Sequence, residues 1–415
     1  MTTTRTVRQP RYLQDFVCAA DKCLDNCCHR WRIDIDKRTY ERYTREVNHA
    51  VLGPLIEKYI RRDRKSGSEA NHGHIALRDD GSCPFLTQGN LCRVQKTLGA
   101  EALSFICRTY PRMQTAVGGQ LEQYGALSCP EIARKVLADP HALDFEEREI
   151  EAAAILSAST VVKTGPATER FLLLREAAVS LIDAHAPDAD AGVFAVVMLA
   201  RGVEEEDEDE AATHGAGGPD FAARLAARVR MLALPAFAAN FDRVAVDPAI
   251  PMRLLKEIVI ERLADPGIQK VWPRYLETIV ECLHGLNYSD DDRAGSLQGY
   301  SAAKAGFQGF AAAHPWVMRN IALYDATRNG LFMPDNGPLL KQALQLTIRY
   351  VYLRFLLTGL HALWREKFDM ERCVNAAYAF SRAIEHNPRF VAKIVALLEE
   401  RELAGAAGIA VMLRG

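Results

Sequence analysis

The 415-residue sequence has no long apolar run that is free of charged residues. Residues 1–16 contain no apolar core of signal-peptide length, so we expect that the protein is not exported. The most apolar long segment, Leu339 to Trp364, is interrupted by Lys341, Arg349 and Arg354. A membrane span would have to bury these charges, so the segment predicts a core helix instead. We therefore expect a cytoplasmic protein without a membrane partner.

Cysteine and strand-like alternation are both scarce in the later part of the chain. Beyond residue 129 only Cys282 and Cys373 occur, and their helical surroundings predict buried, inert side chains. Residues 141–415 show amphipathic periodicity, which predicts an all-helical C-terminal domain suited to binding a substrate. The predicted helices are 146–159, 166–185, 190–201, 220–233, 251–264, 270–286, 300–326, 337–366, 369–386 and 388–404.

The sequence also lacks the glycine-rich turn between a strand and a helix that a Rossmann-type cofactor site requires. Gly118 and Gly119 do not have this context, and the glycines at 215–218 follow no predicted strand. The acidic and then glycine-rich stretch at about 203–219 predicts a solvated loop. A Rossmann-type nucleotide site is therefore not expected.

Eight cysteines are present in the first third of the chain. They are Cys18, Cys23, Cys27, Cys28, Cys83, Cys92, Cys107 and Cys129. Converging thiolates are strong, soft donors that select zinc, copper(I) or iron–sulfur clusters. Four disulfides are the alternative for an even number, but no export signal is present, and the adjacent Cys27 and Cys28 are awkward to bridge to each other. The pattern indicates metal without deciding which one.

Charge is unevenly distributed along the chain. Residues 1–115 hold 20 Lys and Arg against 13 Asp and Glu, whereas the whole chain has a formal net charge of −2. A basic region can attract nucleic acid. Aromatic and basic residues are only sparsely interleaved there, so we expect no nucleic-acid partner and interpret the cations as an offset to thiolate-bound metal.

Residues 1–140 predict a cysteine-rich, loop-and-helix metal-binding domain, which makes the whole fold mainly α. Asp36 is the expected cap of a helix that runs to Ile60. Ser128, with Glu131 three residues later, has the pattern of a capping box. That pattern places Cys129 in the first turn of a helix, where the helix dipole favours the thiolate.

The cysteine-containing segments together resemble a known family. FVCAADKCLDNCCHRWRIDID, CPFLTQGNLCRVQKTLGAEALS, CRTYPR and LSCPE, at residues 16–36, 83–104, 107–112 and 127–131, resemble the flagellin lysine N-methylases of the FliB type. The Cys-x3-Cys-Cys element also resembles a broader group of zinc- or iron-chelating domains. The resemblance is close over residues 12–140, because order, spacing and flanking residues all coincide.

The resemblance implies a function and two cofactors. It implies transfer of methyl groups from S-adenosylmethionine to lysine ε-amines of flagellin or a similar protein, with a [4Fe–4S] cluster bound by the eight N-terminal cysteines. Eight thiolates exceed the four that one cubane requires. Either two centres exist, or four cysteines ligate and the others are structural or bind a second metal. The Cys-x3-Cys-x2-Cys register of radical enzymes is absent, because Arg30 occupies its third position.

Residues near these motifs are candidates for the chemistry. A lysine must lose its proton before it can accept a methyl group by a polar route, so carboxylates and tyrosines are expected at the site. We predict Tyr110, Asp36 and Tyr124 as catalytic residues. Cation–π attraction and bidentate hydrogen bonds suit a sulfonium cofactor with a carboxylate, which makes Arg30, Trp31, Arg108 and Arg112 the cofactor-binding candidates. Packing aromatics and solvated surface arginines are the plainer interpretation of the same residues.

A function of another class is compatible with the same cysteines. The chain could be a zinc- or iron-binding module without enzymatic activity, joined to a helical domain that binds a partner. Methyl transfer that is lost when the metal is removed would separate the two hypotheses.

Overall fold

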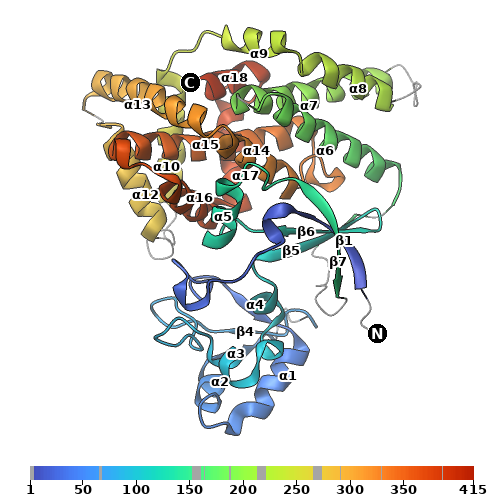
Figure 1. Ribbon diagram of the computed structural model, residues 1–415, viewed down its shortest axis with the longest axis vertical. Coiled ribbons are helices and arrows are strands. Elements are labelled where there is room, and N and C mark those ends of the chain that lie inside the picture. The colour runs from blue at the N-terminus through green and yellow to red at the C-terminus, as the bar shows by residue number, and fades with distance from the viewer. Residues whose placement is uncertain are drawn as a thin grey trace.

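Figure 1 shows the computed structural model as a large helical body joined to a smaller lobe that contains α1 to α4. The structure describes residues 4–64, 68–151, 160–162, 164–186, 188–212, 221–264, 273–289, 291–328, 330–385 and 387–415. Helices dominate these residues, so the mainly α class is confirmed.

The small lobe has its own hydrophobic core. Ile33, Tyr43 and Phe85 are almost completely buried in it. A three-stranded antiparallel sheet of order β2-β4-β3 and four short helices surround this core. The elements are β2 (Ile33–Ile35), β3 (Ile60–Arg62), β4 (Gly73–Ile75), α1 (Lys37–Arg45), α2 (Gly53–Tyr59), α3 (Arg93–Leu98) and α4 (Phe105–Thr109).

The helix predicted from Asp36 to Ile60 begins as expected but does not continue. The Asp36 carboxylate accepts a hydrogen bond from the Thr39 amide, which confirms it as the cap of α1. The helix ends at Arg45, and a second helix starts at Gly53. A Cβ at Gly53 would lie 2.0 Å from the Val47 oxygen, so the chain folds back closely there. Pro54 has no amide hydrogen and favours a new helix start over a continued helix.

A five-stranded sheet of order β7-β1-β6-β5-β8 lies between the lobe and the helices (Figure 1). Its strands are β1 (Thr4–Pro10), β5 (Arg112–Val117), β6 (Gln120–Gly125), β7 (Phe145–Glu151) and β8 (Thr160–Val162). Gly118 and Gly119 form the tight turn between β5 and β6 with φ of +57° and +88°, values that glycine adopts without strain.

Strands β7 and β8 correct the prediction of an all-helical chain beyond residue 141. The predicted helix 146–159 is wrong over its described part, since Phe145–Glu151 is a strand; residues 152–159 lie outside the described ranges. Glu and Arg favour helix in isolation. Here β7 pairs along its whole length with β1, from Thr4 opposite Glu151 to Pro10 opposite Phe145. Tertiary pairing has overridden the local preference.

Long helices form the rest of the body. They are α5 (Pro130–Ala138), α6 (Pro166–Ala184), α7 (Ala189–Ala212), α8 (Phe221–Leu232), α9 (Pro235–Asp242), α10 (Ala249–Leu263), α12 (Pro273–Gly285), α13 (Arg293–Ala313), α14 (Trp316–Arg328), α15 (Leu339–Trp364), α16 (Met370–Ile384), α17 (Pro388–Glu400) and α18 (Ala406–Arg414). The central helix α15 is buried along most of its length, as predicted for a core helix. None of the described helices is both long and apolar enough to span a membrane.

Three boundaries in this body differ from the sequence expectation. The acidic stretch predicted as a loop from residue 203 is helical as far as Ala212, where α7 ends. The predicted helix 300–326 is two helices, because α13 stops at Ala313 and Pro315 precedes α14. The predicted segment 388–404 ends at Glu400 and is followed by the short α18. In each case the sequence pattern did not locate the end of the helix.

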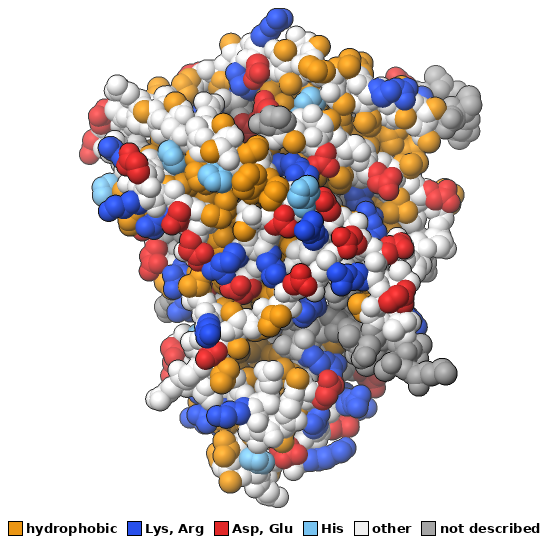
Figure 2. Space-filling model, viewed as in Figure 1, with side chains coloured by type: hydrophobic (Ala, Val, Ile, Leu, Met, Phe, Trp, Pro, Cys, Tyr) orange, Lys and Arg blue, Asp and Glu red, His pale blue; other side chains and the backbone are white. Residues whose placement is uncertain are grey.

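The described residues form two separate hydrophobic cores. Tyr12, Leu13 and Cys129 share one large core with the long helices, whereas the buried core of the small lobe is formed by residues from Ile33 to Ala102. The predicted boundary at residue 140 stays a prediction. On the face seen in Figure 2, acidic and basic side chains are interspersed, so the surplus of cations in residues 1–115 forms no single-sign patch on that face.

Close packing of α12 on α15 can be tested with glycine substitutions. A Cβ at Gly359 would lie 2.4 Å from the Cys282 sulfur and 2.5 Å from the Cys282 oxygen. We expect Gly359→Ala to lower the free energy of unfolding by about 1–3 kcal/mol, the usual cost of overpacking. Gly309→Ala is the matched control in the exposed face of α13, where nothing lies within 4 Å. It should gain about 0.5–1 kcal/mol of helix propensity. Urea unfolding of both variants checks this, and equal midpoints would contradict the close contact.

Candidate functional site

Backbone contacts draw the cysteine-containing loops together at the junction of lobe and body. The Cys83 amide donates to the Cys28 carbonyl at 2.7 Å, and His29 and Ser82 form a bridge beside it. Leu86 and Cys92 form a second bridge. Loops that lie far apart in the sequence therefore run side by side, as the separated cysteines led us to expect.

Five thiols interact electrostatically on the lobe side of this junction. They are those of Cys27, Cys28, Cys83, Cys92 and Cys107. A hydrogen bond from Cys28 lowers the pKa of Cys27 to about 7 despite burial. Burial, with smaller contributions from the charges of Cys83, Cys27 and Cys92, raises the pKa of Cys107 to about 12.

A second set of thiols lies on the side of the body. Burial raises the pKa of Cys129 to about 12, and the neighbouring Cys23 and Cys27 add to this shift. Burial also raises the pKa of Cys23, with further contributions from Cys18 and Cys27. Cys27 thus belongs to both sets and connects all eight thiols.

The donor set fits a metal centre in its chemistry. Several neighbouring thiols are the ligands that iron–sulfur clusters and zinc use. Over the described residues, no three His, Cys, Asp or Glu side chains are placed so that they could hold one metal ion. Burial raises the pKa values of Cys83, Cys92, Cys107 and Cys129, so metal binding at these thiols would have to release their protons.

One guanidinium joins the cysteine loops to the helical body. Arg382 on α16 has a side chain that is only 6% exposed and pairs with the Asp25 carboxylate at 2.7 Å. It also donates to the Asp25 and Ser128 carbonyls, each at 2.8 Å. Asp25 lies between Cys23 and Cys27, and Ser128 directly precedes Cys129. A single residue from the C-terminal helices therefore holds two cysteine loops.

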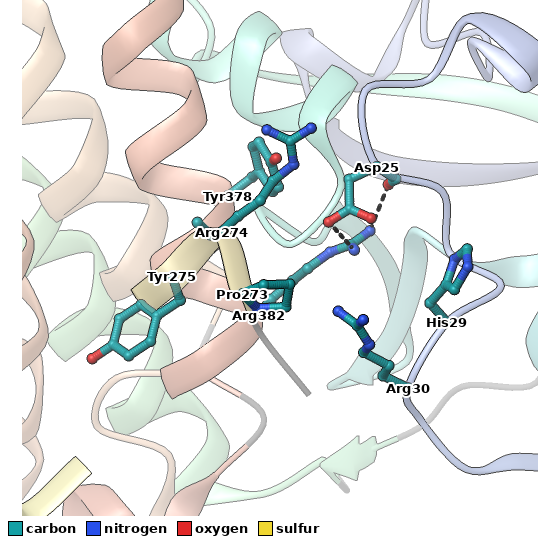
Figure 3. Close-up of a pocket in the computed structure, with 9 residues that line it drawn as sticks. Asp25, His29, Arg30, Pro273, Arg274, Tyr275, Tyr378 and Arg382 are labelled. Carbon is teal, nitrogen blue, oxygen red and sulfur yellow. Dashed lines mark hydrogen bonds and ion pairs between the residues drawn. The ribbon is translucent and has the colours of Figure 1, made fainter. Parts of the chain in front are cut away.

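A cavity of about 210 Å³ lies beside this ion pair, and we call it the junction cavity. Figure 3 shows Asp25, His29 and Arg30 on the loop opposite the side chains from α12 and α16. Its lining is Asp25, His29, Arg30, Pro273, Arg274, Tyr275, Tyr378, Ala379 and Arg382. Three guanidinium groups and one carboxylate line the cavity, so it suits a ligand that carries a carboxylate.

Three of the predicted residues lie at this junction. Arg30 lines the cavity. The Trp31 indole donates to the Cys27 carbonyl at 2.5 Å, and its ring lies 5.5 Å from that of Tyr110. The Tyr110 hydroxyl is 3.1 Å from that of Ser128, and burial raises the pKa of this tyrosine. Trp31 and Tyr110 thus pack around the cysteine loops.

The other predicted residues lie elsewhere. Arg108 is exposed and pairs with Glu101 at 3.2 Å, and Asp36 caps α1 in the small lobe. Arg112 stacks 4.8 Å from the Phe16 ring, within electrostatic reach of Cys18 and Cys129. The catalytic candidates Tyr110, Asp36 and Tyr124 are therefore not brought together.

Tyr124 belongs to a buried ion-pair network in the sheet. Its hydroxyl donates to Glu122, and both carboxylate oxygens of Glu122 accept from Arg175 on α6 at 2.7 Å. Burial raises the pKa of Glu122, but the Arg175 guanidinium outweighs it, so the net pKa lies below its ordinary value. This arrangement fixes α6 to the sheet and leaves Tyr124 with a structural partner.

The capping box predicted at Ser128 is not formed. Helix α5 starts at Pro130 with Cys129 as its N-cap, and no side chain caps it. The Ser128 hydroxyl instead contacts Tyr110, because the preceding loop is held by Arg382. Cys129 still lies at the helix start, as expected.

Four residues that line the junction cavity were not predicted from the sequence: Asp25, Arg274, Tyr378 and Arg382. Asp25 could have been found, because it lies inside the first cysteine motif. Arg274, Tyr378 and Arg382 carry no such signal, since each occurs in an ordinary amphipathic helix far from the cysteines.

The comparisons with known proteins bear on these helices directly. A family model described as the FliB lysine N-methylase C-terminal domain matches residues 175–412, which include α12 and α16. The chain belongs to the FliB lysine N-methylase family. This confirms the predicted FliB-type family through a part of the chain that the cysteine motifs do not cover, whereas the resemblance of the Cys-x3-Cys-Cys element to zinc- or iron-chelating domains stays a prediction.

Curated relatives of the FliB family extend over nearly the whole chain. The lysine-N-methylases of Salmonella choleraesuis and Salmonella typhimurium are each 25% identical over 386 residues, which is 92% of either chain. The flagellar biosynthetic protein FliU of Salmonella muenchen is 35% identical over 145 residues, covering 35% of this chain and 84% of that protein. No solved structure matches the chain.

The role of Arg382 can be tested by hydrogen exchange. Breaking a buried ion pair by removing one partner typically costs about 3–5 kcal/mol, and 1.4 kcal/mol is a factor of ten. We expect Arg382→Met to speed amide exchange at residues 23–29 and 126–131 at least about tenfold. Arg401→Met, which removes an exposed pair with Glu257, should leave both loops unchanged. Unaltered exchange in the Arg382 variant would show that Arg382 does not hold the two cysteine loops.

Proposed function

We propose that this protein is a protein lysine N-methyltransferase that uses S-adenosylmethionine and modifies flagellin or a flagellin-like protein. The family match and the two relatives named lysine-N-methylase, which align over 92% of the chain, support the reaction. The FliU relative, named as a flagellar biosynthetic protein, supports the flagellar connection. The observation that carries the proposal is that the matched helices α12 and α16 form one wall of the junction cavity.

The junction cavity offers groups that suit the methyl donor. S-adenosylmethionine supplies a methyl group on a positively charged sulfur, next to an amino-acid end with a carboxylate and an ammonium. Arg30 and Arg274 can bind the carboxylate, and Asp25 can accept from the ammonium. The phenol ring of Tyr378 lines the same cavity and can lie against a cation. The cavity therefore suits the amino-acid end of the donor.

The lysine must arrive as a neutral amine, since an ammonium has no lone pair. Its ordinary pKa is about 10.4, so a carboxylate of the site must accept one proton from it before transfer. The amine nitrogen then forms a bond to the methyl carbon while the carbon–sulfur bond breaks and its electron pair stays on sulfur. Holding the two reactants in line accounts for much of the acceleration that such a site can give.

We further propose that the N-terminal cysteines hold an iron–sulfur cluster on which activity depends. When bound, the cluster supplies iron atoms that cross-link loops with little regular structure of their own. Cys28 and Cys107 each interact electrostatically with Cys27 and Cys83, which favours these four thiols as the ligands. Thiols are free to bind metal in a reducing compartment, which is consistent with a cytoplasmic enzyme.

Two measurements on protein purified without oxygen test this function. Iron, sulfide and zinc are counted per chain, and flagellin is incubated with S-adenosylmethionine and analysed by mass spectrometry for methylated lysine. We expect iron and sulfide in stoichiometric amounts and methyl groups on lysine. Zinc without sulfide, together with no transfer, would contradict the proposal and favour a metal-binding module without enzymatic activity.

Cysteine variants separate the cluster from the fold. Cys83→Ser is expected to lose iron and to lower the methylation rate more than about tenfold, because it removes a ligand. Cys373→Ala is the control, since this thiol is fully buried in α16 and far in sequence from the motif. Iron retained in both variants would exclude Cys83 as a ligand.

A further inference from the structure

A second cavity, of about 150 Å³, adjoins the junction cavity, and we call it the side cavity. Arg274 and Tyr378 line both cavities, so the two share a wall. The other lining residues of the side cavity are Glu277, Thr278, Glu281, Leu360, Trp364, Arg372, Asn375 and Ala376. It lies between α12, α16 and the end of α15, on the side away from the cysteine loops.

The side cavity combines carboxylates with an aromatic ring. Glu277 and Glu281 are four residues apart on α12, which places them on the same face of that helix. The Trp364 indole donates to Glu281 at 3.3 Å and so orients this carboxylate. The Arg372 guanidinium is stacked 3.6 Å from the Trp364 ring and donates to the Lys367 carbonyl, so its charge is held at the indole.

Two polar atoms in this cavity have no partner among the described residues. The Tyr378 hydroxyl is one, although this side chain is 0% exposed, and the buried Asn375 Oδ1 atom is the other. Buried polar groups are nearly always hydrogen-bonded in folded proteins. Both residues belong to α16 and line the cavity, so we expect a ligand that donates hydrogen bonds to these two oxygen atoms.

We propose that the side cavity receives the lysine side chain of the protein substrate and presents its amine across Tyr378 to the methyl donor in the junction cavity. This proposal rests on the proposed function. Glu277 and Glu281 attract the ammonium, and the Asn375 carbonyl accepts one of its N–H groups. Tyr378 lines both cavities, so its hydroxyl lies beside the amine at the point where the two cavities adjoin. Arg274 lines both cavities, and the donor carboxylate bound to it offsets its charge.

Direct binding tests the lysine site without turnover. The probe is a fluorescent flagellin peptide with one lysine, compared with the same peptide carrying norleucine, in the presence of S-adenosylhomocysteine. We expect the wild-type protein to prefer the lysine peptide at least about tenfold. The double variant Glu277→Gln, Glu281→Gln should lose this preference, whereas Glu399→Gln on the exposed face of α17 should keep it. Equal preference in wild type and double variant, or no preference in wild type, would overturn the proposal.

Steady-state kinetics distinguish the role of the two glutamates from that of the Tyr378 hydroxyl. The double variant is expected to raise the KM for the peptide more than about tenfold without changing the KM for S-adenosylmethionine. Tyr378→Phe should lower kcat more than KM, because it removes only the hydroxyl. Circular dichroism and the thermal midpoint confirm that each variant is folded. If the double variant methylates the peptide with an unchanged KM, the lysine site is refuted but the proposed function is kept. If the wild-type protein binds the lysine peptide selectively but never methylates it, the proposed function is refuted and the lysine site is kept.

Discussion

The buried ion pair between Arg382 and Asp25 is the constraint on which the site depends. The cysteine loops contain few helices or strands, so little in their own backbone fixes them against the body. Arg382 supplies three contacts to two of these loops from a rigid helix. A buried ion pair adds little net stability in general, but leaving one partner alone is costly. Its main effect is therefore to select one arrangement of loops and helices.

One face of α16 connects the cysteine loops with both cavities. Asn375, Tyr378 and Arg382 are three and four residues apart, so they lie in a row along the helix. Arg382 holds the cysteine loops, Tyr378 lines both cavities, and Asn375 lines the side cavity. A cationic cavity and a cavity with paired carboxylates thus adjoin each other. This is the charge arrangement that a carboxylate-bearing donor and a cationic acceptor require.

The sequence predicted the family, the helical class and the cysteine loops, because each rests on a local pattern. Asp36 caps its helix and Leu339 to Trp364 is a core helix, since capping and apolar periodicity are local properties. Strand β7 was missed because its charged residues favour helix until β1 pairs with them. Arg382 was missed because its partners lie more than 250 residues away in the chain. Long-range partners of this kind leave no mark on a single sequence.

The most direct test of the whole account is a crystal structure of the protein purified without oxygen, with S-adenosylhomocysteine and a lysine peptide bound. The account predicts the adenosyl-bearing ligand in the junction cavity, with its carboxylate on Arg30 or Arg274. It predicts the lysine side chain in the side cavity, with its amine beside the Tyr378 hydroxyl. Either ligand bound elsewhere, for example against the five-stranded sheet near Tyr124, would contradict the account.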